Sequence, residues 1–352
     1  MNKKLFYFII LSVTLLLIKG CGSLDLHMEN SYVGSMNYDS ATKSFRNSNK
    51  ESNDKSTFEL LSFLFDFLKR PHDIKESEGF RLLDPLIQED SLNSRQITWI
   101  GHSTLLLTID GVTILTDPVF SSRASPFSNF GPKRVTPPGL QIIDLPKIDA
   151  VIISHNHYDH LDIKSLQKLN KLQPHIRYFV PLGLKSLLLK YDLEFVHELD
   201  WWEKATFSGL TFIATPVNHW SSRSLFDRNK TLWSGWMVNW PNYSFYFAGD
   251  TGYSNDFIET RKRLGRPDLA AIPIGAYAPR YFMKQSHINP EEAVRVFEDL
   301  HANRAVAIHW GTYKLTTELL NEPPKRLRAE IKRKNIKSSA FIVLEHGQKL
   351  NL

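Results

Sequence analysis

The stretch VIISHNHYDHLD, residues 151–162, decides how this chain folds. It opens with a short apolar run that is typical of a buried strand. His155, His157, Asp159 and His160 follow directly, so four potential metal ligands crowd one strand end. Imidazole and carboxylate groups are ligands that Zn²⁺ accepts. The full HxHxDH spacing is much more specific than a pair of histidines, and it predicts a metal site.

Further ligands must come from elsewhere in the chain, because the six residues of the HxHxDH motif, 155–160, cannot complete two metal sites. Three later β-rich runs each lead into one candidate: 212–217 into His219, 243–248 into Asp250, and 305–308 into His309. The sequence therefore predicts a metal centre assembled from the ends of four strands.

From residue 96 onward, short β-rich runs alternate with helical patterns. Asp110-Gly111 is a hairpin signal, and Asn289 followed by Pro290 marks a helix start. Strands are predicted at 97–100, 105–109 and 112–115, and helices near 162–169, 182–190, 290–300 and 324–334. This pattern predicts an α/β protein with two sheets between outer helices.

The composition indicates one large enzyme domain. The chain has 352 residues, of which 42% are hydrophobic, and its mean hydropathy of -0.27 excludes a polytopic membrane protein. The formal net charge is +6, and three of the basic residues lie within residues 1–20, which contain no acidic residue. The remaining balance predicts no nucleic-acid partner and suits an anionic lipid surface only weakly.

Residues 1–20 have the layout of a signal peptide. Two lysines precede an apolar run from 5 to 18, which is shorter than the roughly 20 residues of a membrane-spanning helix. The run leads to Cys21 in a sequence that resembles a bacterial lipoprotein box, although Lys19 departs from that pattern. We expect an exported envelope protein that is lipid-anchored through Cys21. An ordinary signal peptide and an uncleaved signal anchor are the alternatives.

Cys21 is the only cysteine of the sequence, so neither an intrachain disulfide nor a second thiolate ligand is available. Residues 21–57 are rich in Ser, Asn, Asp and Lys and are predicted to form a disordered tether. Residues 58–95 are predicted as a helical extension that begins with FELLSFLFDFLK. Burial of this helix against the domain or a second subunit is favoured, and contact with lipid is the alternative. The catalytic domain is predicted at 96–352.

The order of HxHxDH, then His, Asp and His on later strand ends, resembles that of the metallo-β-lactamase superfamily. The superfamily fold is an αββα sandwich of two mixed sheets flanked by helices. Within it the chain is similar to the N-acylphosphatidylethanolamine-hydrolysing phospholipase D family over about residues 97–345. The matching stretches include WIGHS at 99–103, LTDP at 115–118, ISHNHYDHLD at 153–162, FAGDTGY at 247–253 and AIHWGT at 307–312.

The resemblance implies two Zn²⁺ ions and assigns their ligands. One ion would be held by His155, His157 and His219, the other by Asp159, His160 and His309, with Asp250 bridging the two. A water shared by two cations has a strongly lowered pKa and would serve as the nucleophile. The implied reaction cleaves the phosphodiester of N-acylphosphatidylethanolamine-type lipids to phosphatidic acid and an N-acylethanolamine. Asp250 would also assist proton transfer as a catalytic residue.

The resemblance also implies that Tyr158 and His287 contact the substrate head group or its amide, and that His287 is a catalytic residue as well. The match is imperfect there, because Ser286 stands where the family carries a glutamine. A helix-entry residue without catalytic consequence is the alternative for His287. Head-group selectivity and acyl-chain preference therefore stay open.

Other residues near these motifs have simpler interpretations. His102 and Asp117 follow strands but fall outside the ligand order, so hydrogen bonding to ligands or loop structure explains them. Four cations are candidates for pairing with phosphate or for ordinary surface charges: Arg223, Arg228, Arg280 and Lys284. Two tryptophan-rich stretches, 201–202 and 233–240, predict an acyl-chain groove, with core packing or a dimer seam as the alternatives.

Three functional hypotheses follow. The first is a binuclear zinc phospholipase D acting on phospholipid at a membrane surface, with a homodimer as an open alternative for its oligomeric state. The second is a broad phosphodiesterase or a sugar-phosphate lactonase, since related families share the metal ligands. The third is a noncatalytic envelope lipoprotein that keeps the fold as a binding scaffold, which predicts eroded ligands.

Overall fold

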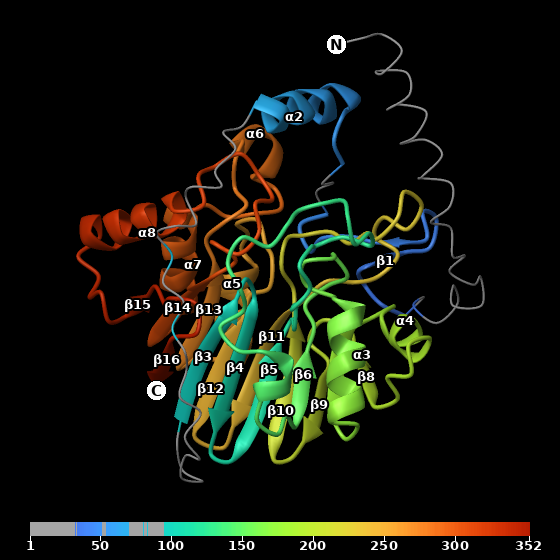
Figure 1. Ribbon diagram of the computed structural model, residues 1–352, viewed down its shortest axis with the longest axis vertical. Coiled ribbons are helices and arrows are strands. Elements are labelled where there is room, and N and C mark those ends of the chain that lie inside the picture. The colour runs from blue at the N-terminus through green and yellow to red at the C-terminus, as the bar shows by residue number, and fades with distance from the viewer. Residues whose placement is uncertain (1–31, 33, 51–53, 70–79, 81–82, 84–94) are drawn as a thin grey trace.

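Two seven-stranded sheets pack face to face in the computed structural model, with helices on both outer faces (Figure 1). This is the αββα sandwich predicted from the sequence. The structure describes residues 32, 34–50, 54–69, 80, 83 and 95–352. The predicted signal peptide and Cys21 lie outside these residues, as does most of the segment from 70 to 94.

The first sheet has the strand order β16-β3-β4-β5-β6-β7-β8. Its ladders are antiparallel from β16 to β5 and parallel from β5 to β8. The hairpin predicted at Asp110-Gly111 joins β4 to β5, and both residues have positive φ. The strands are β3 (Arg95–Gly101), β4 (Thr104–Ile109), β5 (Val112–Thr116), β6 (Ala150–Ile152), β7 (Arg177–Pro181), β8 (Val196–Leu199) and β16 (Lys349–Asn351).

The second sheet repeats this arrangement in the order β9-β10-β11-β12-β13-β14-β15. Three antiparallel pairings are again followed by three parallel ones. Both sheets are therefore mixed, as predicted. The strands are β9 (Lys204–Phe207), β10 (Leu210–Thr215), β11 (Gly235–Trp240), β12 (Tyr243–Phe247), β13 (Leu269–Pro273), β14 (Arg304–Ile308) and β15 (Phe341–Ile342).

Helices cover the outer face of each sheet (Figure 1). Asp162 caps α3, and Asn289 forms a capping box with Glu292 at the start of α7, as the Asn-Pro signal predicts. Helices α3 (Ile163–Leu172) and α4 (Lys185–Leu189) pack on the first sheet, with the 3-10 turn η3 (Ile142–Asp144) beside α3. Those beside the second sheet are α5 (Asp256–Leu264), α7 (Pro290–Leu300) and α8 (Glu322–Arg333), whereas α6 (Arg280–Met283) lies at one end of the sandwich (Figure 1).

The core between the sheets is apolar and rich in aromatic rings. Phe179 of β7 stacks on Phe212 of β10, with ring centroids 3.8 Å apart, so the two sheets contact each other directly. Trp201, Trp233, Trp236 and Trp240 are buried in the same core. Among the interpretations of the tryptophan-rich stretches, core packing is therefore the one that these four residues satisfy.

The prediction of a disordered tether over residues 21–57 is wrong for residues 34–50, which we call the N-terminal strap. The strap contains a small hairpin of β1 (Tyr38–Asp39) and β2 (Ser44–Phe45). The Phe45 side chain is fully buried in the main core and packs on the Tyr38 and Tyr32 rings. The prediction failed because one buried aromatic side chain anchors an otherwise polar segment, and composition averages such a residue away.

The predicted apolar helix forms as α2 (Thr57–Lys69). Of the two partners predicted to bury it, the domain is the wrong one, and burial against a second subunit stays a prediction. None of its residues is buried, because it touches the domain mainly through α6. Phe63 stacks on Phe282 at 4.4 Å, and the Tyr281 hydroxyl donates to Asp66. Figure 1 shows α2 lying over α6 at one end of the sandwich. No helix among the described residues is long and apolar enough to cross a membrane.

Candidate metal centre

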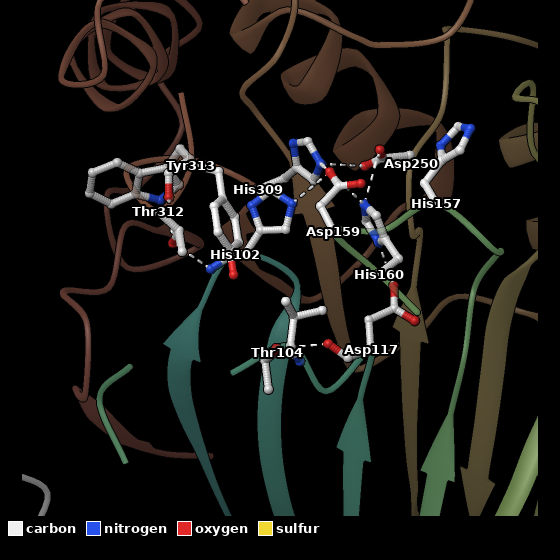
Figure 2. A network of polar contacts seen from close by, with 12 residues as sticks. His102, Thr104, Asp117, His157, Asp159, His160, Asp250, His309, Thr312 and Tyr313 are labelled. Atoms are coloured by element: carbon white, nitrogen blue, oxygen red, sulfur yellow. Dashed lines mark hydrogen bonds and ion pairs between the residues drawn. The ribbon is translucent and has the colours of Figure 1, made fainter. Parts of the chain in front are cut away.

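A cluster of histidines and aspartates forms at one edge of the sandwich, where strands of both sheets end (Figure 2). The first sheet contributes the loop after β6, which carries residues 155–160. The second sheet contributes single residues that follow β10, β12 and β14, namely His219, Asp250 and His309. Parallel strands end at the same edge of a sheet, so this topology brings together side chains that are distant in sequence. All seven predicted ligands meet there.

Three imidazoles form one group. The Nε2 atom of His155 lies 2.8 Å from Nδ1 of His157, and Nε2 of His219 lies 3.3 Å from that same Nδ1. Ligand nitrogens bound at 2.0–2.1 Å to one tetrahedral metal lie about 3.4 Å apart. The three nitrogens therefore fit a single metal ion.

The second group is centred on Asp159. Its Oδ2 atom lies 3.5 Å from Nε2 of His309 and 3.6 Å from Nε2 of His160. Asp250 lies between the groups: Oδ2 is 3.1 Å from Nε2 of His160 and 3.9 Å from Nε2 of His219. Its Oδ1 is 3.1 Å from Nε2 of His309. Asp250 thus occupies the position that a ligand shared by two metal ions requires.

The outer nitrogens of three imidazoles are held by hydrogen bonds. Nδ1 of His160 lies 2.6 Å from Oδ2 of Asp117, and Nδ1 of His219 lies 2.9 Å from the carbonyl of Ser286. Nδ1 of His155 lies 2.9 Å from Oγ of Ser154, which also donates to Asp117. Such partners fix the ring orientation and leave the other nitrogen as the metal ligand. The donor set therefore fits metal binding.

Burial keeps one group of imidazoles neutral. It lowers the pKa of His155 well below the usual range. It lowers the pKa of His157 and that of His219 to about 3. Because a metal binds the neutral imidazole, these shifts favour the ligand form.

In the other ligand group, neighbouring charges outweigh burial in setting the pKa values. Burial would raise the pKa of Asp250, but His160 and His309 outweigh it and hold that pKa well below the usual range. Burial would lower the pKa of His309, but Asp250 and Asp159 raise it to about 9. A proton on His309 thus balances carboxylate charge that a cation would balance, and we expect metal binding to release it.

The backbone beside the ligands is conformationally demanding. His102, Asp117 and His309 have φ values of 53°, 32° and 63°, which are uncommon for residues other than glycine. Gly249, with φ +60°, precedes Asp250, and a Cβ atom there would lie 2.6 Å from that of Ser154. Such conformations cluster at functional sites, where the surrounding structure maintains them.

His287 lies inside the centre, and Tyr158 has a different local role. Nδ1 of His287 is 3.8 Å from Oδ2 of Asp250, and burial lowers the His287 pKa to about 3. Nδ1 has no hydrogen-bond partner among the residues that the structure describes. The Tyr158 hydroxyl donates to the carbonyl of Arg223, whose guanidinium covers the Tyr158 ring. Tyr158 therefore fastens the β6 loop to the loop after His219.

The four candidate phosphate-binding cations are mostly engaged by protein groups. Arg223 donates to the carbonyls of Asn156 and Leu161, which braces the ligand loop. Arg228 pairs with Asp54, and Arg280 pairs with Glu292 and donates to the carbonyl of His287. Lys284 is exposed. Structural roles therefore account for the three arginines.

Two residues beside the metal centre, His102 and Asn47, contact the ligands, but only the role of His102 was predicted from the sequence. His102 was predicted to support ligands or loop structure, and its Nε2 lies 3.0 Å from Oδ2 of Asp159. Asn47 was not predicted at all, yet its Oδ1 accepts a hydrogen bond from the backbone nitrogen of His219. A single asparagine in a polar segment carries no sequence signal of such a role.

Comparison with known proteins agrees with this geometry. Residues 112–310 match a family described as "Beta-lactamase superfamily domain". N-acyl-phosphatidylethanolamine-hydrolyzing phospholipase D 1 of Caenorhabditis elegans is 43% identical over 263 residues, covering 71% of this chain and 74% of that protein. The mitochondrial N-acyl-phosphatidylethanolamine-hydrolyzing phospholipase D of Saccharomyces cerevisiae is 37% identical over 271 residues, covering 75% of this chain and 55% of that protein.

A solved structure supports the fold. Igni18, a metallo hydrolase from the archaeon Ignicoccus hospitalis, matches with a TM-score of 0.55 and 21% identity. The match covers 74% of this chain and 98% of that chain.

Proposed function

This chain belongs to the β-lactamase superfamily and, within it, to the family of N-acylphosphatidylethanolamine-hydrolysing phospholipases D, and on that basis we propose which bond it cleaves. It is a metal-dependent hydrolase. The proposed substrate is an N-acylphosphatidylethanolamine or a related phospholipid, cleaved to phosphatidic acid and an N-acylethanolamine. The observation that carries the proposal is Asp250 between two ligand groups, in a chain 43% identical to a phospholipase D of this type.

We propose two Zn²⁺ ions as cofactors, one per ligand group. When bound, they would acidify a water molecule and neutralise charge on the phosphate oxygens, which makes a nucleophilic serine or cysteine unnecessary. The residues of the chain would orient this chemistry. Asp250 would hold the two groups in register, and His287, which the carbonyl contact from Arg280 helps to place, would contact the head group.

The proposal includes a membrane surface as the place where the enzyme meets its substrate. Helix α2 exposes a row of large apolar side chains over α6, and α6 is followed by His287 after three residues. The exposed side chains are Phe58, Leu60, Leu61, Leu64, Phe65 and Leu68. An apolar helix face of this kind suits the interfacial region of a bilayer. Export and lipid anchoring through Cys21 would place the domain there.

Product analysis tests the reaction. The purified chain is loaded with Zn²⁺ and offered synthetic N-acylphosphatidylethanolamine, a simple phosphodiester and a sugar-phosphate lactone, and products are identified by mass spectrometry. We expect phosphatidic acid and N-acylethanolamine in equal amounts, with loss of turnover after chelation and recovery when Zn²⁺ is returned. Turnover of the lactone alone would replace the lipid assignment with lactonase activity. Turnover of none would favour the binding scaffold.

Vesicle sedimentation tests the surface. Leu61→Ser with Leu64→Ser should reduce sedimentation of the chain with phospholipid vesicles at least about fivefold, because two apolar contacts are lost. Ile143→Ser provides the control, since Ile143 is at least as exposed as the two leucines but lies on the 3-10 turn η3 beside α3. Unchanged sedimentation of the α2 variant, combined with loss of a dimer by light scattering, would instead assign the helix face to a second copy.

A further inference from the structure

The N-terminal strap reaches the metal centre through one side chain. Oδ1 of Asn47 accepts two hydrogen bonds at 3.0 Å, one from the backbone nitrogen of His219 and one from Nε1 of Trp233. Asn47 is 5% exposed, so these bonds lie out of water. Leaving a buried donor without its acceptor costs about 1–3 kcal/mol. Nε1 of Trp233 also donates to the carbonyl of Val217 at 2.9 Å, so the loss of Asn47 would fall mainly on the backbone nitrogen of His219.

Other contacts hold the strap in this position. The Phe45 backbone nitrogen donates to the carbonyl of Asn229, and Nζ of Lys230 donates to the carbonyl of Lys43, so the hairpin is fastened to the loop after His219. On the other side of Asn47, Oγ of Ser48 donates to Oδ1 of Asp256 at the start of α5. Asn47 is therefore held between two anchors rather than resting loosely on the surface.

His219 has a distinct place among the ligands of its group. His155 and His157 come from one loop of the first sheet, whereas His219 comes from the second sheet. The group closes only if the His219 backbone stays in place relative to that loop. The Ser286 carbonyl fixes the ring of His219, and Asn47 fixes its backbone.

We propose that Asn47 is a positioning residue for His219, so that the N-terminal strap is part of the metal centre. The inference rests on the proposed two-metal function and deepens it. Asn47 lies outside residues 112–310, the part that matches the superfamily domain, so the chain supplies this support from its own N-terminal segment. Residues that orient a metal ligand contribute about 10- to 100-fold to metal affinity.

Metal titration of the full chain tests the proposal. Chelator competition measures the two Zn²⁺ dissociation constants of the wild type, Asn47→Ala and Asn47→Asp, and Co²⁺ absorption reports the ligand geometry. His157→Ala identifies which constant belongs to the group that contains His219. We expect Asn47→Ala to weaken that step about 10- to 100-fold and to leave the other within about threefold. Asn47→Asp, which keeps an acceptor oxygen, should restore tight binding.

Thr42→Ala is the matched control, because Thr42 is exposed on the same strap and its hydroxyl bonds to Asp39 and Ser44, away from Asn47 and the ligands. Wild-type metal binding by Asn47→Ala would overturn the proposal. Equal weakening of metal binding by Asn47→Ala and Thr42→Ala would also overturn it, as would failure of Asn47→Asp to restore binding. Fewer than two ions on the wild type would instead overturn the proposed two-metal centre, so the two failures are distinguishable.

Discussion

The loop after β6 and the N-terminal strap both reach the metal centre, but different forces hold them there. The loop leaves a strand that pairs on both sides, and a buried network around Asp117 ties it down. The two strands of the strap pair only with each other. What attaches the strap to the domain is the buried Phe45 side chain and a few hydrogen bonds. The loop therefore supplies ligands from a firmly held segment of the first sheet. The proposed role of the strap is to hold one ligand of the second sheet, His219, in position.

Loss of the shared ligand should have the largest effect. Asp250→Ala removes the carboxylate between the two groups, and we expect kcat to fall at least about a thousand-fold. The measurement is lipid turnover together with bound zinc by elemental analysis. His175→Ala, at an exposed histidine outside the cluster, should retain wild-type activity. Comparable activity of the two variants would mean that the ligand loops matter no more to turnover than an exposed histidine outside the cluster.

Truncation of the strap anchor should follow in size. Phe45→Ala empties a buried aromatic position, and we expect the free energy of unfolding to fall by about 3 kcal/mol. Urea unfolding measures it, with Met36→Ala as the control, because Met36 is 93% exposed on the same strap. Equal stability of the two variants would mean that the strap does not belong to the folded domain.

A methyl group beside the bridging ligand should cost less. Gly249→Ala introduces a Cβ atom 2.6 Å from that of Ser154 at a φ of +60°, and we expect about 2 kcal/mol of destabilisation. Gly209→Ala is matched in backbone conformation, with φ +76°, but no described atom lies within 4 Å of its added Cβ. It should cost about 1 kcal/mol. If the costs were equal, steric contact at Gly249 would contribute nothing.

The smallest effect is expected on α2. Leu64→Ser and Leu68→Ser should each change the free energy of unfolding by less than about 0.5 kcal/mol, because both side chains are exposed. Urea unfolding of the isolated chain at low concentration is the appropriate measurement. If either variant lowered the free energy of unfolding by about 2 kcal/mol, α2 would be packed in solution and would stabilise the domain as the strap does.

The ligand loops could be predicted from the sequence because their information is local. HxHxDH, and single ligands after β-rich runs, placed all seven ligands at strand ends, and the structure brings them together. The sandwich, the Asp110-Gly111 hairpin and the cap at Asn289 also followed from short patterns.

The strap could not be predicted because its information is not local. Phe45 is an isolated aromatic residue in a polar segment, and its burial depends on a core formed by residues far along the chain. Asn47 acts through a partner 172 positions away, a pairing that no periodicity encodes. The exposed face of α2 shows the converse error, since an apolar composition predicts burial but does not name what covers the helix.

The strand order also bears on when the metals can enter. β16 (Lys349–Asn351) pairs with β3, which comes first along the chain among the strands of this sheet, and His309 follows β14. A chain still emerging from the ribosome or crossing a translocation channel therefore has neither its closing strand nor its last ligand. The group of Asp159, His160 and His309 therefore cannot be complete before His309 has been synthesised. If the chain is exported as proposed, the ion of that group is drawn from the compartment in which the chain finishes folding, whatever the zinc supply where it was made.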